Sequence, residues 1–455
     1  MVMDTLQQRM HHWAQRQQRH LERYSPVTIY GRVTGISGIL IACALPGARI
    51  GDLCRIMRSD GDDGVLAEIV GFSPEKILLS ALGALDGISQ GALIIPLYLP
   101  HCICISERLL GSVLDGFGRA LEPGGHSAFA EPGSEHQAVP VLNDAPAPTE
   151  RPRIDTPLPT GLRAIDGLLT IGNGQRVGVF AGAGCGKTTL LAELARNTPC
   201  DVIVFGLIGE RGRELREFLD HELDDKLRSR TVLLCATSDR SSMERARAAF
   251  TATAIAEAFR ADGKKVLLIV DSLTRFARAQ REIGLALGEP PGRGGLPPSV
   301  YTLLPRLVER AGQTQQGAIT ALYSVLIEQD SMNDPVADEV RSLIDGHIVL
   351  SRRLAERNHY PAIDILASLS RTMSNVVERA HIMQAGKLRS LMAAYQQVEM
   401  LIRLGEYQPG NDPLTDAAVN ANNLINQFLR QPMRAPDSFE HIQYQLAEVS
   451  SHAPE

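Results

Sequence analysis

Residues 177–189 read VGVFAGAGCGKTT, and this stretch decides the fold of the central part of the chain. An apolar strand pattern runs into a glycine-rich loop that ends in Gly-Lys-Thr, and an apolar helical pattern follows. This order of strand, loop and helix is the context that a P-loop requires. Glycines let successive backbone N–H groups point inward at a helix N-terminus, where a partial positive charge favours an anion. The stretch therefore predicts a nucleotide-binding domain.

The loop and the first turn of its helix supply the candidate nucleotide-binding residues. They are Gly182, Ala183, Gly184, Cys185, Gly186, Lys187, Thr188 and Thr189. In a P-loop the lysine reaches the β- and γ-phosphates and the next hydroxyl binds Mg²⁺, roles that fall here on Lys187 and Thr188. Ala181 stands where the strict motif has glycine, but the loop glycines that follow supply the backbone freedom.

Two carboxylates are placed by the strands that precede them. Residues 266–270 form a buried apolar run that ends in Asp271, the arrangement that holds a Walker-B carboxylate near Mg²⁺. Glu210 follows the apolar run 202–208, and ligands bind at the carboxyl ends of parallel strands. From position alone, Glu210 is only slightly preferred over Glu214 as the group that polarises an attacking water. A surface ion pair is the alternative role for either residue.

Apolar runs alternate with helical patterns on both sides of the loop, a pattern typical of a parallel sheet covered by helices on both faces. The predicted strands are 177–180, 202–208, 232–234, 266–270, 319–327 and 347–350. We place this α/β domain at residues 161–379.

The regions that flank this domain have other patterns. Residues 25–100 contain short β-rich runs separated by turn residues, which predicts a small β-barrel. The barrel has few aromatic or basic residues, so a structural or oligomerising role is favoured over a nucleic-acid groove. Residues 101–160 are expected to connect the domains, and their Pro- and Gly-rich part lacks periodicity. Residues 380–455 carry helical stripes, one of which ends at a plausible C-cap, Gly405.

Residues 1–24 have an amphipathic, mildly basic helical pattern. The pattern indicates either an arm that docks on its own protein or a helix that binds a partner or a membrane surface. No apolar run approaches the ~20 residues of a membrane span. Seven scattered cysteines fit a reducing cytoplasm, where we expect the protein to stay. The formal net charge of −6 disfavours a globally basic nucleic-acid binder. A length of 455 residues leaves room for roughly three compact units.

Several long motifs occur in order and resemble one family. They are GERGRELREF (209–218), DSLTRFARAQREI (271–283), PPSVYTLLPRLVERAG (297–312), DPVADEVRSLIDGHIVLSRRLAERNHYPAID (334–364) and LASLSRTMSNV (366–376). They look like the export ATPases of type III secretion systems, the injectisome and flagellar relatives of the catalytic subunit of rotary ATP synthases. The likeness covers about residues 27–430. It implies a multidomain α/β fold with an N-terminal β-barrel, a central RecA-like P-loop domain and a C-terminal helical domain.

The resemblance also implies roles for residues that no local pattern assigns. Glu210 would activate the attacking water, with Arg211 beside it as a supporting charge. The ring of Tyr360 would flank the adenine, which stacking makes reasonable. Arg371 would be an arginine finger delivered to the ATP of the neighbouring subunit. With Lys187, these residues complete the predicted catalytic set, with ATP and Mg²⁺ as cofactors and Thr188 and Asp271 at the metal.

The family further implies a homohexameric ring that energises protein export. A coiled-coil stalk would occupy the central pore, a stator dimer would hold the N-terminal helix, and chaperone–effector complexes would meet the C-terminal helices. Membrane association would then be indirect, at the inner-membrane export apparatus, and no nucleic-acid partner is expected.

Other functions stay open at this point. A flagellar export ATPase is the nearest alternative, and overall motif likeness favours the injectisome. A rotary synthase subunit would require a non-catalytic paralogue in the ring. A hexameric RNA translocase is disfavoured by the negative charge and the aromatic-poor barrel, and a non-hydrolysing structural subunit by the presence of Lys187, Glu210, Asp271 and Arg371 in one chain.

Overall fold

The structure is a computed structural model that describes residues 29–453 apart from 59–63, 75, 132–137 and 328–333, together with Met10, Trp13 and Ala14. The chain divides into two compact units, one ending at Leu99 and the other beginning at Pro100. The predicted helix over residues 1–24 lies outside the described residues except for those three, which are helical.

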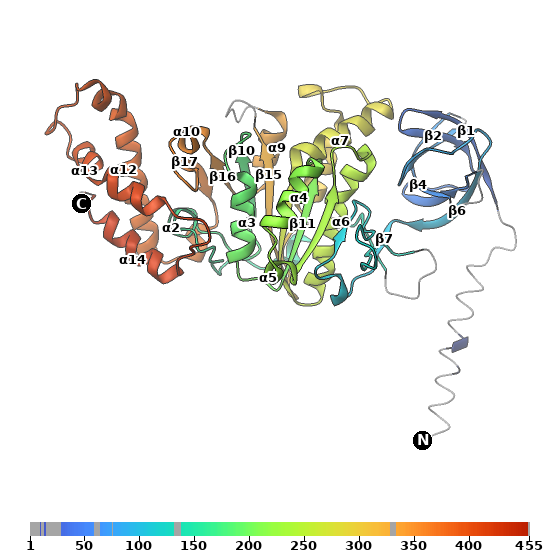
Figure 1. Ribbon diagram of the computed structural model, residues 1–455, viewed down its shortest axis with the longest axis horizontal. Helices are drawn as coiled ribbons and strands as arrows, with labels where there is room; N and C mark the ends of the chain where they lie inside the picture. The colour runs from blue at the N-terminus through green and yellow to red at the C-terminus, as the bar shows by residue number, and fades with distance from the viewer. Residues whose placement is uncertain are drawn as a thin grey trace, which may run out of the picture. The chain divides into compact units, whose positions relative to one another are not determined.

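The first unit is a closed barrel with strand order β1-β2-β5-β4-β3-β6 (Figure 1). The strands are β1 (Gly31–Ser37), β2 (Leu40–Ala44), β3 (Asp52–Ile56), β4 (Val65–Ser73), β5 (Lys76–Ala81) and β6 (Leu93–Pro100). Residues with apolar side chains, among them Val33, Ile41 and Ile69, fill the interior. Alternating burial along β1 places one set of side chains inside and the other outside, as a strand with one buried face requires. The predicted barrel is therefore confirmed.

The second unit is built around a nine-stranded sheet of order β17-β16-β10-β15-β13-β11-β12-β8, with β14 beside β15. Its strands are β8 (Val113–Leu114), β10 (Arg176–Ala181), β11 (Val202–Ile208), β12 (Thr231–Ala236), β13 (Lys265–Asp271), β14 (Gly312–Gln313), β15 (Ala318–Leu326), β16 (Gly346–Leu350) and β17 (Ile363–Ser370). The strands from β16 to β8 pair in parallel, and β14 and β17 are antiparallel. The predicted parallel strands are confirmed, whereas β8, β14 and β17 were not predicted.

Helices cover both faces of this sheet. Phe205 of β11 contacts Phe218 of α4, whereas a Cβ on the next residue, Gly206, would meet Ala252 of α6. Because successive strand residues point to opposite faces, α4 and α6 lie on opposite sides. The helices are α2 (Arg163–Leu168), α3 (Lys187–Asn197), α4 (Gly212–His221), α5 (Asp225–Arg228), α6 (Ser242–Ala261), α7 (Leu273–Ala286), α8 (Pro298–Val308), α9 (Pro335–Leu343), α10 (Arg352–Glu356) and α11 (Met373–Val376).

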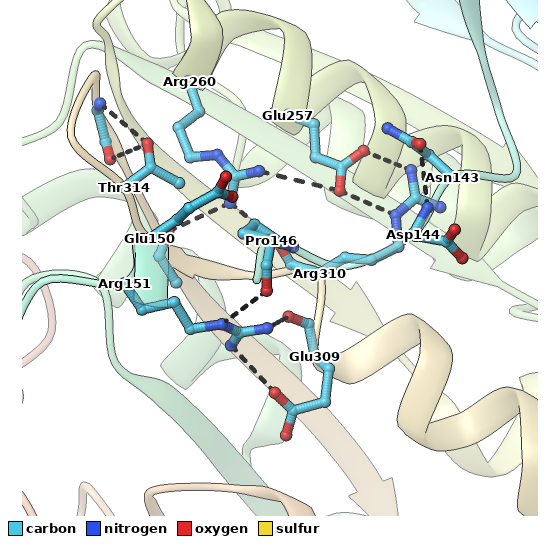
Figure 2. A network of polar contacts seen from close by, with 12 residues as sticks. Asn143, Asp144, Pro146, Glu150, Arg151, Glu257, Arg260, Glu309, Arg310 and Thr314 are labelled. Atoms are coloured by element: carbon cyan, nitrogen blue, oxygen red, sulfur yellow. Dashed lines mark hydrogen bonds and ion pairs between the residues drawn. The ribbon is translucent and has the colours of Figure 1, made fainter. Parts of the chain in front are cut away.

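The segment between the barrel and the sheet is held by charged side chains as well as by short regular elements. It contains β7 (Cys102–Ile103), β9 (Val139–Pro140) and the 3₁₀ turns η1 (Glu107–Leu109) and η2 (Pro148–Glu150); a third turn, η3 (Arg293–Gly295), lies before α8. Arg310 is fully buried and pairs with Glu257 of α6 at 2.9 Å (Figure 2). It also donates to the Val141 carbonyl. Arg151 pairs with Glu309 at 3.0 Å. These contacts fasten a segment that has no periodic pattern.

Three helices form the C-terminal region: α12 (Arg379–Leu404), α13 (Pro413–Leu429) and α14 (Phe439–Ser450). Gly405 caps α12 in a left-handed conformation with φ of 73°, as predicted. The three helices contact α2, and their apolar side chains belong to the same core cluster as those of the sheet. Of the helices that the structure describes, none combines the length and the hydropathy of a membrane span.

Candidate active site

The glycine-rich loop joins the end of β10 to the start of α3. Gly184 and Gly186 have φ of 81° and 84°, a left-handed conformation that glycine adopts without steric cost. Gly186 is the N-cap of α3, so the loop ends at that helix's N-terminus. A Cβ at Gly186 would lie 3.7 Å from Cε1 of Tyr360, so the tyrosine ring stands directly beside the loop. The backbone therefore has the shape that a phosphate-binding loop requires.

Lys187 lies between two carboxylates. Its ammonium forms an ion pair with Asp271, at the end of β13, and lies 3.8 Å from Oε1 of Glu210, just after β11. Ser324 of β15 donates a hydrogen bond of 2.6 Å to Oδ1 of Asp271. Asp271 is almost fully buried, and the lysine is 10% exposed. The structure thus brings together three of the predicted residues at the edge where β10, β11 and β13 end, which we call the carboxyl edge.

Glu210 is held by a residue that the sequence reasoning did not single out. Arg275 of α7 pairs with Oε2 of Glu210 at 3.2 Å and also donates to the Gly209 carbonyl. Gly209 has φ of 67°, and a Cβ there would lie 2.9 Å from Cδ of Arg275, so glycine permits this close approach. Arg275 belongs to the quoted DSLTRFARAQREI motif, but nothing local in the sequence assigns it to Glu210.

The environment of Glu210 suits proton transfer near neutral pH. Burial raises the pKa of its carboxyl to about 7, with further increases from a hydrogen bond with Glu214 and from the charge of Asp271. The positive charges of Lys187 and Arg275 act in the opposite direction on this pKa. A base whose pKa is close to the working pH is the most effective general base. Of the two carboxylates that the sequence left open, Glu210 is the one at ion-pair distance from Lys187.

Thr188 and Arg211 are both exposed. Thr188 follows Lys187 in the first turn of α3. Arg211 is the N-cap residue of α4, and its side chain is 79% exposed and 3.9 Å from Glu214. The structure therefore places Thr188 at the loop and turns Arg211 toward solvent.

A cavity of about 270 Å³ lies beside the loop. Tyr360 and Met433 line it, together with loop residues from Gly184 to Gly186. The backbone N–H of Gln431 donates to the Tyr360 carbonyl at 3.0 Å, which joins the segment after α13 to the cavity wall. An aromatic ring on a largely apolar wall suits a flat heterocycle. Residues 431–433 were not predicted as part of the site, because they follow the loop by more than 200 positions and carry no motif.

Arg371 lies at the opposite edge of the sheet. β17 runs antiparallel to β16, so Ser370 pairs with Gly346, and Gly346 pairs with Val177 near the start of β10. β10 has six residues, which span about 20 Å at roughly 3.3 Å per residue. Arg371 is exposed at this amino edge, the edge where β10 begins. One chain therefore does not bring Arg371 to its own Lys187 and Glu210.

Comparisons with known proteins identify the family. The barrel domain of the ATP synthase alpha/beta family matches residues 33–97, its nucleotide-binding domain matches 161–370, and the T3SS EscN ATPase C-terminal domain matches 377–448. The chain is 65% identical to the type 3 secretion system ATPase of Pseudomonas syringae pv. tomato, over 98% of this chain and 99% of that protein. The chain belongs to the type 3 secretion system ATPases. A flagellum-specific ATP synthase of Pseudomonas aeruginosa is 45% identical over 95% of the chain and 97% of that protein.

Solved structures agree with this membership of the secretion ATPase family. The assembled ATPase EscN from the type III secretion system of enteropathogenic E. coli is similar with a TM-score of 0.85 and 45% identity, covering 92% of this chain and all of that one. EscN in complex with its central stalk EscO is similar with a TM-score of 0.83 and 44% identity, at the same coverage. The chain is therefore an ATPase with the predicted three-part fold.

Proposed function

We propose that this secretion ATPase works as a homohexameric ring whose active sites are shared between neighbouring subunits, and that the ring energises protein export. The observation that carries the proposal is the division of the candidate residues between the two edges of one sheet. Lys187 and Glu210 lie at the carboxyl edge and Arg371 at the amino edge. A ring lets the amino edge of one subunit face the carboxyl edge of the next. The solved relative described as an assembled ATPase supports this arrangement.

In the proposed reaction Lys187 turns from Asp271 toward the β- and γ-phosphates, and residues 182–189 surround them. Glu210 accepts the proton of the attacking water. Arg371 of the neighbouring subunit stabilises charge on the transferring phosphoryl group, and Tyr360 flanks the adenine. Arg211, paired with Glu214, supplies a supporting charge near Glu210.

The donors fit a magnesium ion. Mg²⁺ prefers oxygen ligands, and a buried carboxylate fixed by Ser324 together with a hydroxyl at the start of α3 provides them. Asp271 and Thr188 would therefore hold Mg²⁺, which offsets phosphate charge when bound.

The proposed partners follow from the family. We assign residues 25–100, the barrel, to the crown of the ring and residues 101–160 to the connection. We assign residues 161–379 to the RecA-like domain and residues 380–455 to the cargo-facing helices. The stalk in the pore is supported by the complex of EscN with EscO. We assign a stator to the segment of residues 1–24. We assign chaperone–effector complexes, with chaperone release and effector unfolding, to the C-terminal helices. The protein would then be cytoplasmic and peripheral at the inner-membrane export apparatus.

The test is specific ATPase activity measured against protein concentration, with mass followed in parallel by light scattering. For wild type, activity per subunit should rise with the hexamer fraction, and Lys187→Ala should be inactive at the same mass. Activity that is independent of concentration in a monomer would overturn the shared site. The higher identity to a secretion-system relative than to a flagellar one favours the injectisome role.

A further inference from the structure

The segment that carries Arg371 is fixed on both sides of the arginine. The Arg371 N–H donates to the Asp345 carbonyl at 3.0 Å, and Ser370 Oγ donates to the Thr170 carbonyl at 2.8 Å. Thr372 is buried, whereas Arg371 itself is exposed. The backbone is therefore anchored at a point where the side chain is left in solvent.

Gln175 hydrogen-bonds to Ser370, to Thr372 and to the carbonyl that accepts the Arg371 N–H. It lies directly before β10 and is 0% exposed. Its Oε1 accepts from the Gly172 N–H at 2.8 Å and from Thr372 Oγ1 at 2.6 Å. Its Nε2 donates to the Asp345 carbonyl at 3.2 Å and to Ser370 Oγ at 3.4 Å.

The orientation of this amide is determined by its partners. A backbone N–H only donates and a carbonyl only accepts, so Gly172 requires the oxygen on its side and Asp345 requires the nitrogen. All of the contacts are made at once in a single orientation. A buried amide destabilises the fold unless its hydrogen bonds are made. Here one bond joins Gln175 to the Gly172 N–H, and the other three go to residues 370 and 372 and to the Asp345 carbonyl that accepts the Arg371 N–H.

We propose that Gln175 is a positioning residue for Arg371, holding the finger segment in the place from which the guanidinium reaches the neighbouring subunit. This inference rests on the proposed finger role of Arg371. An error of about 1 Å in the placement of a catalytic group can cost on the order of 10²-fold in rate. The guanidinium at the end of a long, exposed side chain is placed accurately only if the backbone that carries it is fixed.

A neutral amide suits this task better than a charged group. A carboxylate at this position would attract the guanidinium that must stay available. The carboxylate of Asp345 is already engaged by Arg176, with two hydrogen bonds of 3.0 Å, so it does not compete for Arg371. Gln175 also directly precedes β10, the strand that ends at the P-loop, so this strand and the residue before it position Lys187 for its own subunit and Arg371 for the next.

The experiment uses the full-length chain with Gln175→Met, which keeps the length of the side chain and removes its hydrogen bonds. We expect kcat to fall on the order of 10²-fold while affinity for a fluorescent methylanthraniloyl-ATP and ring mass stay at wild-type values. Thr320→Val is the matched control: Thr320 is buried at the same edge and accepts from the Gly174 N–H at 2.8 Å, but it does not contact residues 370–372. Its kcat should stay near wild type.

If Gln175→Met does not assemble, Thr372→Val removes the bond to Oε1 of Gln175 and the longer contact of 3.4 Å with Ser370 Oγ, and it should give a smaller loss of kcat in intact rings. Equal losses of kcat in Gln175→Met and Thr320→Val would overturn the inference, because they would indicate a general loss of packing.

A double variant and mixed rings separate this inference from the proposal on which it rests. Gln175→Met in an Arg371→Ala background should cause no further loss of kcat. Mixing Gln175→Met with Glu210→Gln subunits should restore activity, because a Gln175→Met site then receives its finger from a Glu210→Gln neighbour. Wild-type kcat in Arg371→Ala would refute the finger itself. An impaired Arg371→Ala with unchanged Gln175→Met, or additive losses, would refute only the role of Gln175. No restoration on mixing would do the same if Arg371→Ala mixed with Glu210→Gln does restore activity, and would refute the shared site if it does not.

Discussion

The two edges of the nine-stranded sheet prepare their functional residues in opposite ways. At the carboxyl edge, Lys187, Glu210 and Asp271 are mostly buried and engaged with one another through charge. At the amino edge, Arg371 is exposed, and neutral hydrogen bonds from Gln175 hold its backbone. A group that acts on the nucleotide of its own subunit can form ion pairs with other residues of that site before the nucleotide binds. A group that serves another subunit must be accurate in position while its charge stays available.

The largest expected effect comes from removing Arg371, the exposed residue at the amino edge. Arg371→Ala should lower kcat by about 10³-fold or more, which is the usual contribution of an arginine finger. Nucleotide affinity should change little, because the neighbouring subunit's finger acts mainly on charge that develops on the phosphoryl group in the transition state. Steady-state ATPase and methylanthraniloyl-ATP binding on the same rings measure both quantities. A loss of nucleotide affinity as large as the loss of kcat would contradict the proposed difference between the two edges.

Glu210→Gln tests the buried edge and should lower kcat by about 10²- to 10⁴-fold, the range for general-base catalysis. The amide keeps the shape of the side chain, so ATP binding should be retained. Glu217→Gln is the control, since the Glu217 side chain is 54% exposed and pairs with Arg213 on the same helix. A wild-type turnover number in Glu210→Gln would remove the base from the proposed mechanism.

The pH dependence of kcat distinguishes Arg275, which pairs with Glu210, from Arg211, which is exposed. Burial raises the pKa of Glu210 to about 7, and only the carboxylate can accept a proton, so kcat should rise as pH increases through about 7. Arg275 lowers this pKa, so Arg275→Met should move the midpoint of the profile to higher pH. If the midpoint lies one pH unit higher, the ionised fraction of Glu210 is about tenfold lower at pH values below the midpoint. Arg211→Met, at an exposed position, should leave the midpoint near wild type, and an equal displacement would give Arg211 a larger role.

The smallest expected effect comes from the hydroxyl that supports Asp271. Ser324→Ala removes a 2.6 Å hydrogen bond and should destabilise the fold by about 1–2 kcal/mol. It should also raise the Mg²⁺ concentration needed for half-maximal ATPase activity by a few fold, since that bond is worth about 1 kcal/mol in orienting the carboxylate. A magnesium titration and thermal unfolding provide the measurements. An unchanged magnesium requirement would show that the Ser324 hydroxyl does not orient Asp271 for the metal.

The difference between the edges also explains what the sequence could predict. The P-loop and Asp271 are defined by local order, a strand followed by specific residues, and their placement at one edge follows from parallel pairing. Arg371 and Gln175 depend on the antiparallel strand β17, which the apolar pattern did not reveal. Resemblance supplied the expected role of Arg371, but a glutamine before a strand carries no signal by itself. Arg275, Ser324 and residues 431–433 likewise become neighbours of the site only through tertiary packing.

The closed barrel has a consequence for crowding. Its strand order returns from β6 to β1, so the described strands leave no long row of unpaired backbone groups at an edge. Exposed strand edges are the usual starting points for aggregation and for strand exchange between identical chains. In a ring, six identical barrels would meet at very high local concentration. Closure lets them contact one another through side chains alone, so packing many copies together does not invite intermolecular sheet formation.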